Sequence, residues 1–132
     1  MLMKTSELTG RALNWAVAQA QGVPVEFSEY CEDALVVVVP EDDIEYNNDG
    51  YPVWQFYNPA KDWSDGGPII EREGISVLYR TGVRMTASIN GQYEQSVGHR
   101  HKGNIGLLVA MRCYVASKLG DDIDIPAELT KE

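Results

Sequence analysis

The chain has 132 residues and a mass of 14.7 kDa, a length that fits one domain spanning residues 1–132. Its 44% hydrophobic and 23% charged residues are typical of a globular protein and not of a disordered one. No apolar run approaches the roughly 18 residues of a membrane span, and the start lacks the basic and apolar segments of a signal peptide. Two cysteines, Cys31 and Cys113, are too few for a disulfide scaffold. We therefore expect a soluble, cytoplasmic protein that does not bind membranes.

The net charge of −9 is unevenly distributed along the chain. Residues 26–49 contain nine acidic residues and no basic one, whereas residues 80–118 contain six basic residues and one acidic residue. A surface that binds duplex DNA needs clustered basic side chains to displace counterions from phosphates. Because basic residues are the minority, we do not expect direct binding of duplex nucleic acid. Residues 26–49 are either a solvated, mobile loop around one apolar strand or an acidic surface shaped for a basic partner.

Residues 6–21 are predicted to form an amphipathic helix, because their apolar side chains fall on one face at about 100° per residue. Thr5 is placed to cap this helix, and Gly22 follows it as a stop signal. Asn14 and Ala18 fall on the opposite, polar face.

The middle of the chain carries the signals of four strands. They are a β-branched run at 35–39, an aromatic stretch at 51–57, and segments at 75–79 and 84–89. Asn90 and Gly91 give a hairpin-type turn signal after the last of them. Because the strands cluster between two helices, we expect an α+β fold. It would have an antiparallel sheet of about four strands, with the two long helices packed on one face.

Residues 105–119 are predicted to form the second long helix, with Asn104 as its cap and Gly120 after its end. This helix is apolar almost all round, so it must be buried or covered by a partner chain, as in a homodimer. Each helix carries a stripe of small side chains: Thr9, Ala12, Ala16 and Ala20 on the first, and Gly106, Ala110, Cys113 and Ser117 on the second. We expect the two stripes to face each other.

Residues 57–74 contain the glycine and proline residues typical of an ordered loop, and this loop is predicted to lead into a short helix that starts at Pro68. Gly66 and Gly67 permit a positive φ, and their amides can point at an anion or a carboxylate. Asp62, Ser64 and Asp65 offer capping oxygens. Trp63 is either a stacking surface for a ligand or a core residue that makes the connection rigid.

Arg112 falls in the middle of the apolar arc of the second helix. An arginine there needs a carboxylate, a route to the surface or an anionic ligand. A buried ion pair with an acid of residues 62–73 and service to a bound anion both place Arg112 beside that segment. We therefore expect a binding cleft between them, whose candidate residues are Asn58, Asp62, Trp63, Asp65, Gly66, Gly67 and Arg112.

The rest of the sequence gives only weak signals for a cofactor site, a metal site or a catalytic nucleophile. No phosphate-binding loop, nucleophile elbow or zinc-finger spacing is present, so we expect no cofactor and no metal. His99 and His101 would share a face on a strand and so could bind a metal, but Arg100 and Lys102 oppose a cation there, which favours a solvated basic loop. Cys113, within the small stripe of a buried helix, is interpreted as a packing residue and not as a nucleophile.

Three blocks of the sequence carry a more specific signal: residues 3–18 (MKTSELTGRALNWAVA), 62–73 (DWSDGGPIIERE) and 110–121 (AMRCYVASKLGD). Together they resemble the NinX family of small proteins from lambdoid, P22-like phages. The resemblance implies a phage or prophage origin and a bacterial host cytoplasm, and it implies no particular reaction.

Three classes of function follow. The leading hypothesis is a non-enzymatic phage accessory protein that binds a host or phage protein, or a small anionic ligand, through the cleft of residues 62–73 and Arg112. The second is a small enzyme or a nucleotide- or anion-binding module in the same cleft, which requires a concave pocket around Trp63. The third is an acidic DNA mimic that occupies the DNA-binding site of a host factor, which requires the acids of residues 26–49 in ordered rows.

Overall fold

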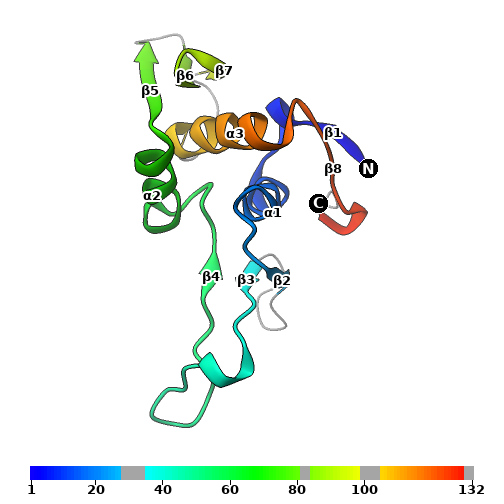
Figure 1. Cartoon of the computed structure of the whole chain (residues 1–132), viewed down its shortest axis with the longest axis vertical. Coiled ribbons are helices and arrows are strands. Elements are labelled where there is room, and N and C mark those ends of the chain that lie inside the picture. The colour runs from blue at the N-terminus through cyan, green and yellow to red at the C-terminus, as the bar shows by residue number, and fades with distance from the viewer. Residues whose placement is uncertain (28–34, 81–83, 99–104, 130–132) are drawn as a thin grey trace.

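The computed structural model describes residues 1–27, 35–80, 84–98 and 105–129. In chain order its elements are β1 (Leu2–Lys4), the 3-10 turn η1 (Thr5–Glu7), α1 (Gly10–Gln21), β2 (Val25–Phe27), β3 (Leu35–Val37), η2 (Glu41–Asp43), β4 (Phe56–Tyr57), α2 (Trp63–Glu73), β5 (Ile75–Arg80), β6 (Arg84–Ile89), β7 (Gln92–Gly98), α3 (Ile105–Leu119), β8 (Asp122–Asp124) and η3 (Ala127–Leu129). The α+β class is confirmed (Figure 1). No helix among these residues is long and apolar enough to cross a membrane.

The described strands form three small antiparallel sheets, in the orders β1-β8, β2-β3-β4 and β5-β6-β7. The expected single sheet of about four strands is therefore wrong: the predicted strands at 75–79 and 84–89 pair with each other, whereas the one at 35–39 pairs elsewhere. The predicted strand at 51–57 shrinks to β4, because residues 51–55 belong to an irregular connection. Strands β1, β2 and β8 have three residues each, too few to show the alternation that identifies a strand in a sequence.

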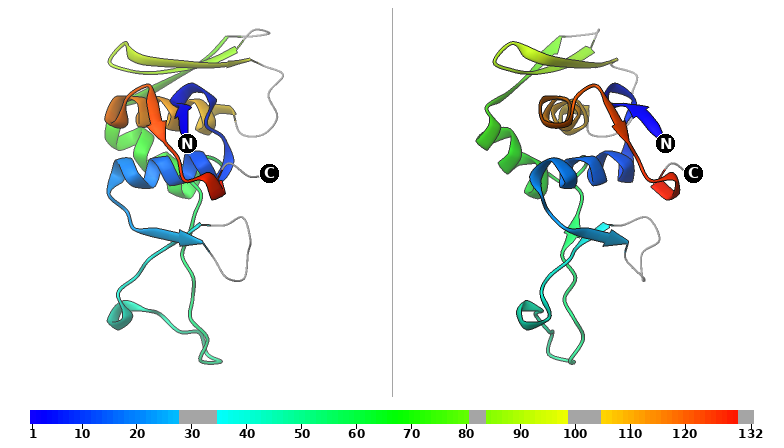
Figure 2. Two further views of the ribbon diagram at one scale, coloured as in Figure 1. Left: turned by 90° about the vertical axis from the view of Figure 1, so that its right-hand side faces the viewer. Right: turned by 45° about the vertical axis from the view of Figure 1, so that its right-hand side comes forward.

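The helices form the middle of the molecule, between two of the sheets, and not one face of a single sheet as expected (Figure 2). Sheet β5-β6-β7 covers one side of α3, while α1 and α2 pack on its other sides. Every residue from Gly106 to Ala116 is buried as a result. The prediction of a buried helix is confirmed, with the bounds expected from the sequence. Its apolar surface, which motivated the homodimer, is covered within one chain.

The small-residue stripe of α3 faces the sheet at Cys113. The thiol of Cys113 lies beside the backbone of Ile89 in β6. Helices α1 and α3 pack on each other, as the two small stripes predict, although Cys113 itself lies beside β6. The small side chain of Cys113 lets the sheet approach α3 closely, and Ala87 of β6 is fully buried as well.

Helix α1 begins at Gly10, later than predicted, with Thr9 at the N-cap position. The earlier residues form η1 instead, and Thr5 does not cap a helix. Its buried hydroxyl donates to the Gly120 carbonyl at 2.6 Å, and its N–H donates to the Asp121 carbonyl at 2.8 Å. Thr5 therefore ties the start of the chain to the segment after α3.

Two residues that the sequence places on the polar face of α1, Asn14 and Ala18, are buried. The reason is that α1 is covered on two sides, by α3 and by the turn at residues 58–60. Gly22 ends the helix in the left-handed conformation, with a φ of 73°, as its stop signal predicts.

Helix α2 begins at Trp63 and not at Pro68, so residues 63–67 of the predicted loop are helical. Asp62 is its N-cap, since the Asp62 Oδ1 accepts the N–H of Ser64 at 2.9 Å. Pro68 lies inside the helix. Glycine and proline both disfavour helices, and Gly66, Gly67 and Pro68 follow one another here. For this reason the sequence does not predict that α2 begins before Pro68.

Asn90 and Gly91 join β6 to β7 as a two-residue turn with φ values of 52° and 74°, which confirms the hairpin turn signal. The strand that follows, β7, was not among the predicted strands.

Candidate functional site

Several residues of the predicted cleft do meet, at the turn before α2, but there they hold the fold together. The Asn58 N–H donates to Asp65 Oδ2, and the Asn58 side-chain oxygen accepts from Asn14 Nδ2, each at 2.9 Å. The Asn14 oxygen accepts the N–H of Ala60 at 2.9 Å. Asn14 is only 7% exposed, so these bonds satisfy a buried amide. Asn58 and Asp65 thus fix the turn before α2 onto α1.

Gly66 and Gly67 lie within α2, and neither adopts the positive φ that glycine permits. The Gly66 N–H donates to the Asp62 carbonyl at 2.9 Å, so it is used inside the helix and is not presented to an anion. A Cβ atom at Gly66 would lie 2.5 Å from the Pro59 carbonyl oxygen and 2.6 Å from Leu107 Cδ2. Glycine is needed at this position for close packing.

Trp63 is the first residue of α2 and is 54% exposed. The interpretation of Trp63 as a core residue is therefore wrong, because a core residue would be buried. Of the predicted group around α2, it is the side chain that offers apolar surface to solvent.

Arg112 is buried on another face of α3, where its Nε donates to the Leu8 carbonyl at 2.7 Å. Burial lowers the pKa of its guanidinium, and the charge of nearby Glu7 partly offsets that shift. Leu107, which lies against Gly66 of α2, is about 140° around the helix from Arg112 at 100° per residue. The partner of Arg112 is thus the segment before α1, and the expected cleft with residues 62–73 is not assembled around it.

The sequence suggests two places where reactive side chains could act, the histidine pair at 99 and 101 and the thiol of Cys113. His99 and His101 lie outside the described residues. Cys113 is fully buried, and burial raises the pKa of its thiol to about 11. The thiol is therefore protonated near neutral pH, and its role as a packing residue is confirmed.

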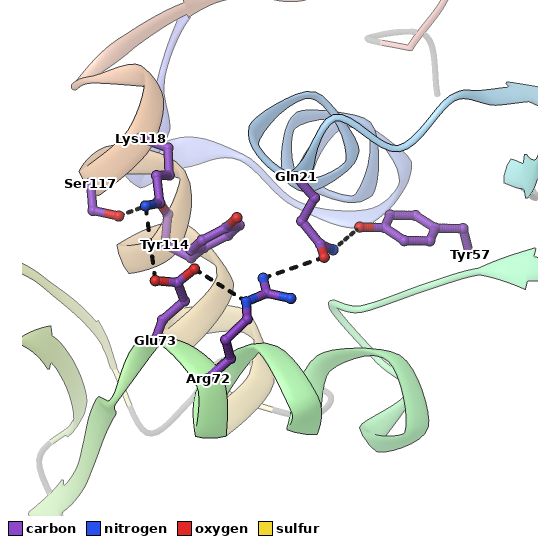
Figure 3. Close-up of polar contacts among 7 residues, drawn as sticks. All are labelled: Gln21, Tyr57, Arg72, Glu73, Tyr114, Ser117 and Lys118. Carbon is purple, nitrogen blue, oxygen red and sulfur yellow. Dashed lines mark hydrogen bonds and ion pairs between the residues drawn. The ribbon is translucent and has the colours of Figure 1, made fainter.

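A set of polar side chains joins all three helices to β4 (Figure 3). Gln21, at the end of α1, donates to the Tyr57 hydroxyl and accepts from Arg72 Nη2 at 3.4 Å. Arg72 Nε contacts Glu73 at 3.4 Å, and the same carboxylate lies 3.9 Å from Lys118 Nζ of α3. Burial raises the pKa of Tyr57, so its hydroxyl stays protonated. This network anchors β4 to the body of the molecule.

Residues 38–55, which connect β3 to β4, form an arm that projects away from the helices (Figure 1). Its own hydrogen bonds order it: the Val53 N–H donates to the Glu45 carbonyl, and at the tip the Asn47 N–H donates to the Tyr51 carbonyl, both at 2.8 Å. No residue of the arm is buried. Connections longer than about 12–15 residues are uncommon in compact domains and are often functional.

Exposed hydrophobic side chains gather on the arm and on the strands at its root. Among the described residues thirteen large hydrophobic side chains are exposed, and seven of them lie in this region: Phe27, Val38, Tyr46, Tyr51, Val53, Trp54 and Phe56. The sequence has no basic residue from 26 to 60. Aromatic side chains gathered on a surface mark binding sites for other proteins.

A pocket of about 200 Å³ opens where the arm meets β2 and β3. Its walls are largely apolar and include Val37, Val38, Ile44, Val53 and Trp54. Three acidic residues also line it: Glu26, Asp43 and Glu45. An apolar cavity with acidic residues among its lining suits a group that is apolar along its length and positive at its end.

These pocket residues were not among the predicted site residues. In the sequence, residues 26–49 are an acidic segment and residues 51–57 have the pattern of a strand, and neither pattern indicates that the two form one surface. A signal was present: Trp54, Phe56 and Tyr57 follow closely on an acidic run, which is unusual for a plain solvated loop.

The fold and the arm define a small α+β protein with an acidic, aromatic surface at one end. Over residues 4–118, the sequence matches the profile of the family described as Bacteriophage P22, NinX. The chain therefore belongs to the NinX family of phage proteins, as the three sequence blocks predict. A search of curated proteins found no match.

Proposed function

We propose that this phage accessory protein acts without catalysis, by binding a partner protein in the cytoplasm of the bacterial host. The observation that carries the proposal is the pocket at the root of the arm, which is lined by apolar residues and three acidic ones. The exposed aromatic side chains around it and the internal hydrogen bonds of the arm support a preformed binding surface. Charge complementarity favours a partner segment that presents basic side chains beside apolar ones.

The pocket favours a protein partner over a nucleotide or another small anion. Carboxylates repel a phosphate, and Glu26, Asp43 and Glu45 all line this site. Its volume of about 200 Å³ is also below the ~300–1,000 Å³ of pockets that enclose cofactors or drug-sized ligands. An enzyme or anion-binding module in a cleft of residues 62–73 gains no support from the helical, internally bonded Gly66.

The acids of the arm support a second candidate, a DNA mimic that occupies the DNA-binding site of a host factor. Glu41, Asp42, Asp43, Glu45 and Asp49 are all exposed. A DNA mimic binds mainly through charge, so its affinity falls steeply with salt and depends little on apolar side chains. Binding through the pocket depends on apolar contacts as well. Removal of an aromatic side chain should therefore weaken the affinity of a protein that binds through the pocket, and it should have little effect on the affinity of a DNA mimic.

The first experiment tests whether the arm contacts a partner. The photoreactive residue p-benzoylphenylalanine replaces either Tyr46 on the arm or Tyr93 in the β6–β7 hairpin, both exposed tyrosines. Irradiation in host cells should join a partner to the chain from position 46 and not from position 93. The partner is then identified, purified and titrated against the wild-type protein by calorimetry.

The second experiment compares two exposed tryptophans in binding to that purified partner. Trp54→Ala should weaken affinity about tenfold or more, because exposed aromatic side chains at interfaces are often hot spots. Trp63→Ala, which lies outside the arm, should leave affinity unchanged. Crosslinks from position 93 alone, or equal affinities of the two variants with little salt dependence, would contradict the proposal. Strong salt dependence with no effect of Trp54→Ala would favour the DNA mimic.

A further inference from the structure

We infer that the pocket at the root of the arm holds one arginine side chain of the partner. The inference rests on the proposed function, since it names the group by which the partner would be anchored. A volume of about 200 Å³ is too small for a cofactor-sized ligand but admits one long side chain. The occupant must therefore be a single group that projects from a larger molecule.

The lining of the pocket selects the chemistry of that group. Val37, Val38 and Val53 offer apolar surface against which an aliphatic stem can pack. Three acidic residues line the same space, from three places in the chain: Glu26 in β2, Asp43 in η2 and Glu45 in the arm. Within the described parts of the chain none of the three forms an ion pair. A cationic side chain would complement all three.

Trp54 distinguishes arginine from lysine as the occupant. Trp54 lines the pocket and is 42% exposed, so it offers aromatic surface at this site. A guanidinium stacks on an aromatic face while its N–H groups donate in its own plane to carboxylates. An ammonium is a compact, more strongly hydrated charge and cannot do both as well. Arginine therefore fits the combination of one indole and several carboxylates best.

The direct test uses a small probe, the blocked tripeptide acetyl-Leu-Arg-Leu-amide, together with two twins. One twin carries citrulline, which has the shape of arginine without its charge, and the other carries lysine. Binding is followed by NMR through the indole N–H signals of the three tryptophans, with Trp54 identified by its loss in Trp54→Phe. The arginine peptide should move the Trp54 signal and leave those of Trp15 and Trp63 in place. The citrulline peptide should bind about tenfold more weakly, and the lysine peptide should fall between them.

Matched variants locate the charge that recognises the probe. Asp43→Asn and Glu45→Gln should each weaken binding of the arginine peptide about three- to fivefold, as expected for partly exposed ion pairs. Asp49→Asn is the control, because Asp49 lies in the same arm and does not line the pocket. It should change affinity by less than about twofold at the same salt concentration. Thermal melts of all three variants check that the fold is unchanged.

Two results would overturn the arginine pocket: equal affinity for the arginine and citrulline peptides, or equal effects of Asp43→Asn and Asp49→Asn. Tighter binding of the lysine peptide would replace arginine as the occupant and so contradict the inference. These results are separate from the proposed function. If the crosslinked partner binds and Trp54→Ala weakens it while the peptides fail, the arm binds without an arginine anchor. If the peptides behave as expected and no partner crosslinks from position 46, the proposed function fails instead.

Discussion

Arg112 lies within the most apolar helix of the molecule, and a backbone group explains why. The Leu8 carbonyl, between η1 and α1, accepts the Arg112 Nε at 2.7 Å. A buried carbonyl that is left without a donor costs stability, so the side chain serves the junction between the start of the chain and α3. No ligand is needed to account for this arginine.

Replacement of Arg112 should reveal the value of that hydrogen bond. Arg112→Met keeps much of the apolar stem and removes the donor, so it should lower the free energy of unfolding by about 1–3 kcal/mol. A buried ion pair broken on one side would have cost about 3–5 kcal/mol. Urea denaturation of wild type and variant measures the difference. Lys61→Met, at an exposed lysine, is the control and should change stability by less than about 0.5 kcal/mol.

A loss above about 3 kcal/mol would point back to a carboxylate partner for Arg112. No loss would show that water replaces the side chain at the Leu8 carbonyl. The need for a partner was predictable from the sequence, because a charge in an apolar helical arc cannot stay unpaired. Its identity was not, since any residue type supplies a backbone carbonyl and nothing in the sequence marks the one that lies nearby.

Among the elements, the strong periodic patterns were the predictable ones. Helix α3 has the predicted bounds, and β6 spans the predicted residues 84–89. The predicted start of helix α2 is five residues too late, because Gly66 and Gly67 are poor helix formers, and of the two only Gly66 is required by tertiary packing. The short strands β1, β2 and β8 exist because of their partners, and no local pattern predicts them.

Gly66 and Gly67 are adjacent in α2 and should respond oppositely to the same substitution. Gly66→Ala places a Cβ atom 2.5 Å from the Pro59 carbonyl oxygen, and backbone cannot easily yield, so it should destabilise the protein by about 1–3 kcal/mol. Gly67→Ala meets its nearest atom, in Trp63, at 3.8 Å. It should be neutral or stabilise by up to about 1 kcal/mol through helix propensity. Thermal melts of both variants measure the contrast, and equal effects would show that Gly66 is not in close contact with Pro59.

The protein consists of a packed body and an arm that takes no part in the core. Each residue of the arm has substantial solvent exposure, whereas α1 and α3 contribute many fully buried side chains. The sequence predicted the α+β class because strands cluster between helices. It could not predict that the strands separate into different sheets, since that choice depends on which face each pair finds to cover. The candidate site was not predictable for the same reason, because its residues come from β2, β3 and the arm, which are brought together by folding.

The body should fold without most of the arm. Val37 lies beside Gln55 at the arm's root, where the Val37 N–H donates to the Gln55 carbonyl at 2.9 Å. Replacement of residues 39–53 by the two-residue turn Asn-Gly would close the hairpin directly. The free energy of unfolding should change by less than about 1 kcal/mol, because no buried side chain is removed and the connection becomes shorter. Circular dichroism and urea denaturation test this, and loss of cooperative unfolding would show that the arm belongs to the core.

The pairing of β1 with β8 has a consequence for the order in which the chain is made. Leu2 lies opposite Asp124, and the Met1 amine donates to Asp124 Oδ1 and to the Ile125 carbonyl, both at 2.8 Å. At about 5–20 residues per second, a ribosome takes roughly 6–24 s to reach that partner strand after β1 has been made. The contacts of Met1 and β1 with β8 and Ile125 cannot form before β8 has been synthesised. Interrupted translation before Asp122 therefore leaves β1 without its neighbour, and only products that extend past this point can complete the fold.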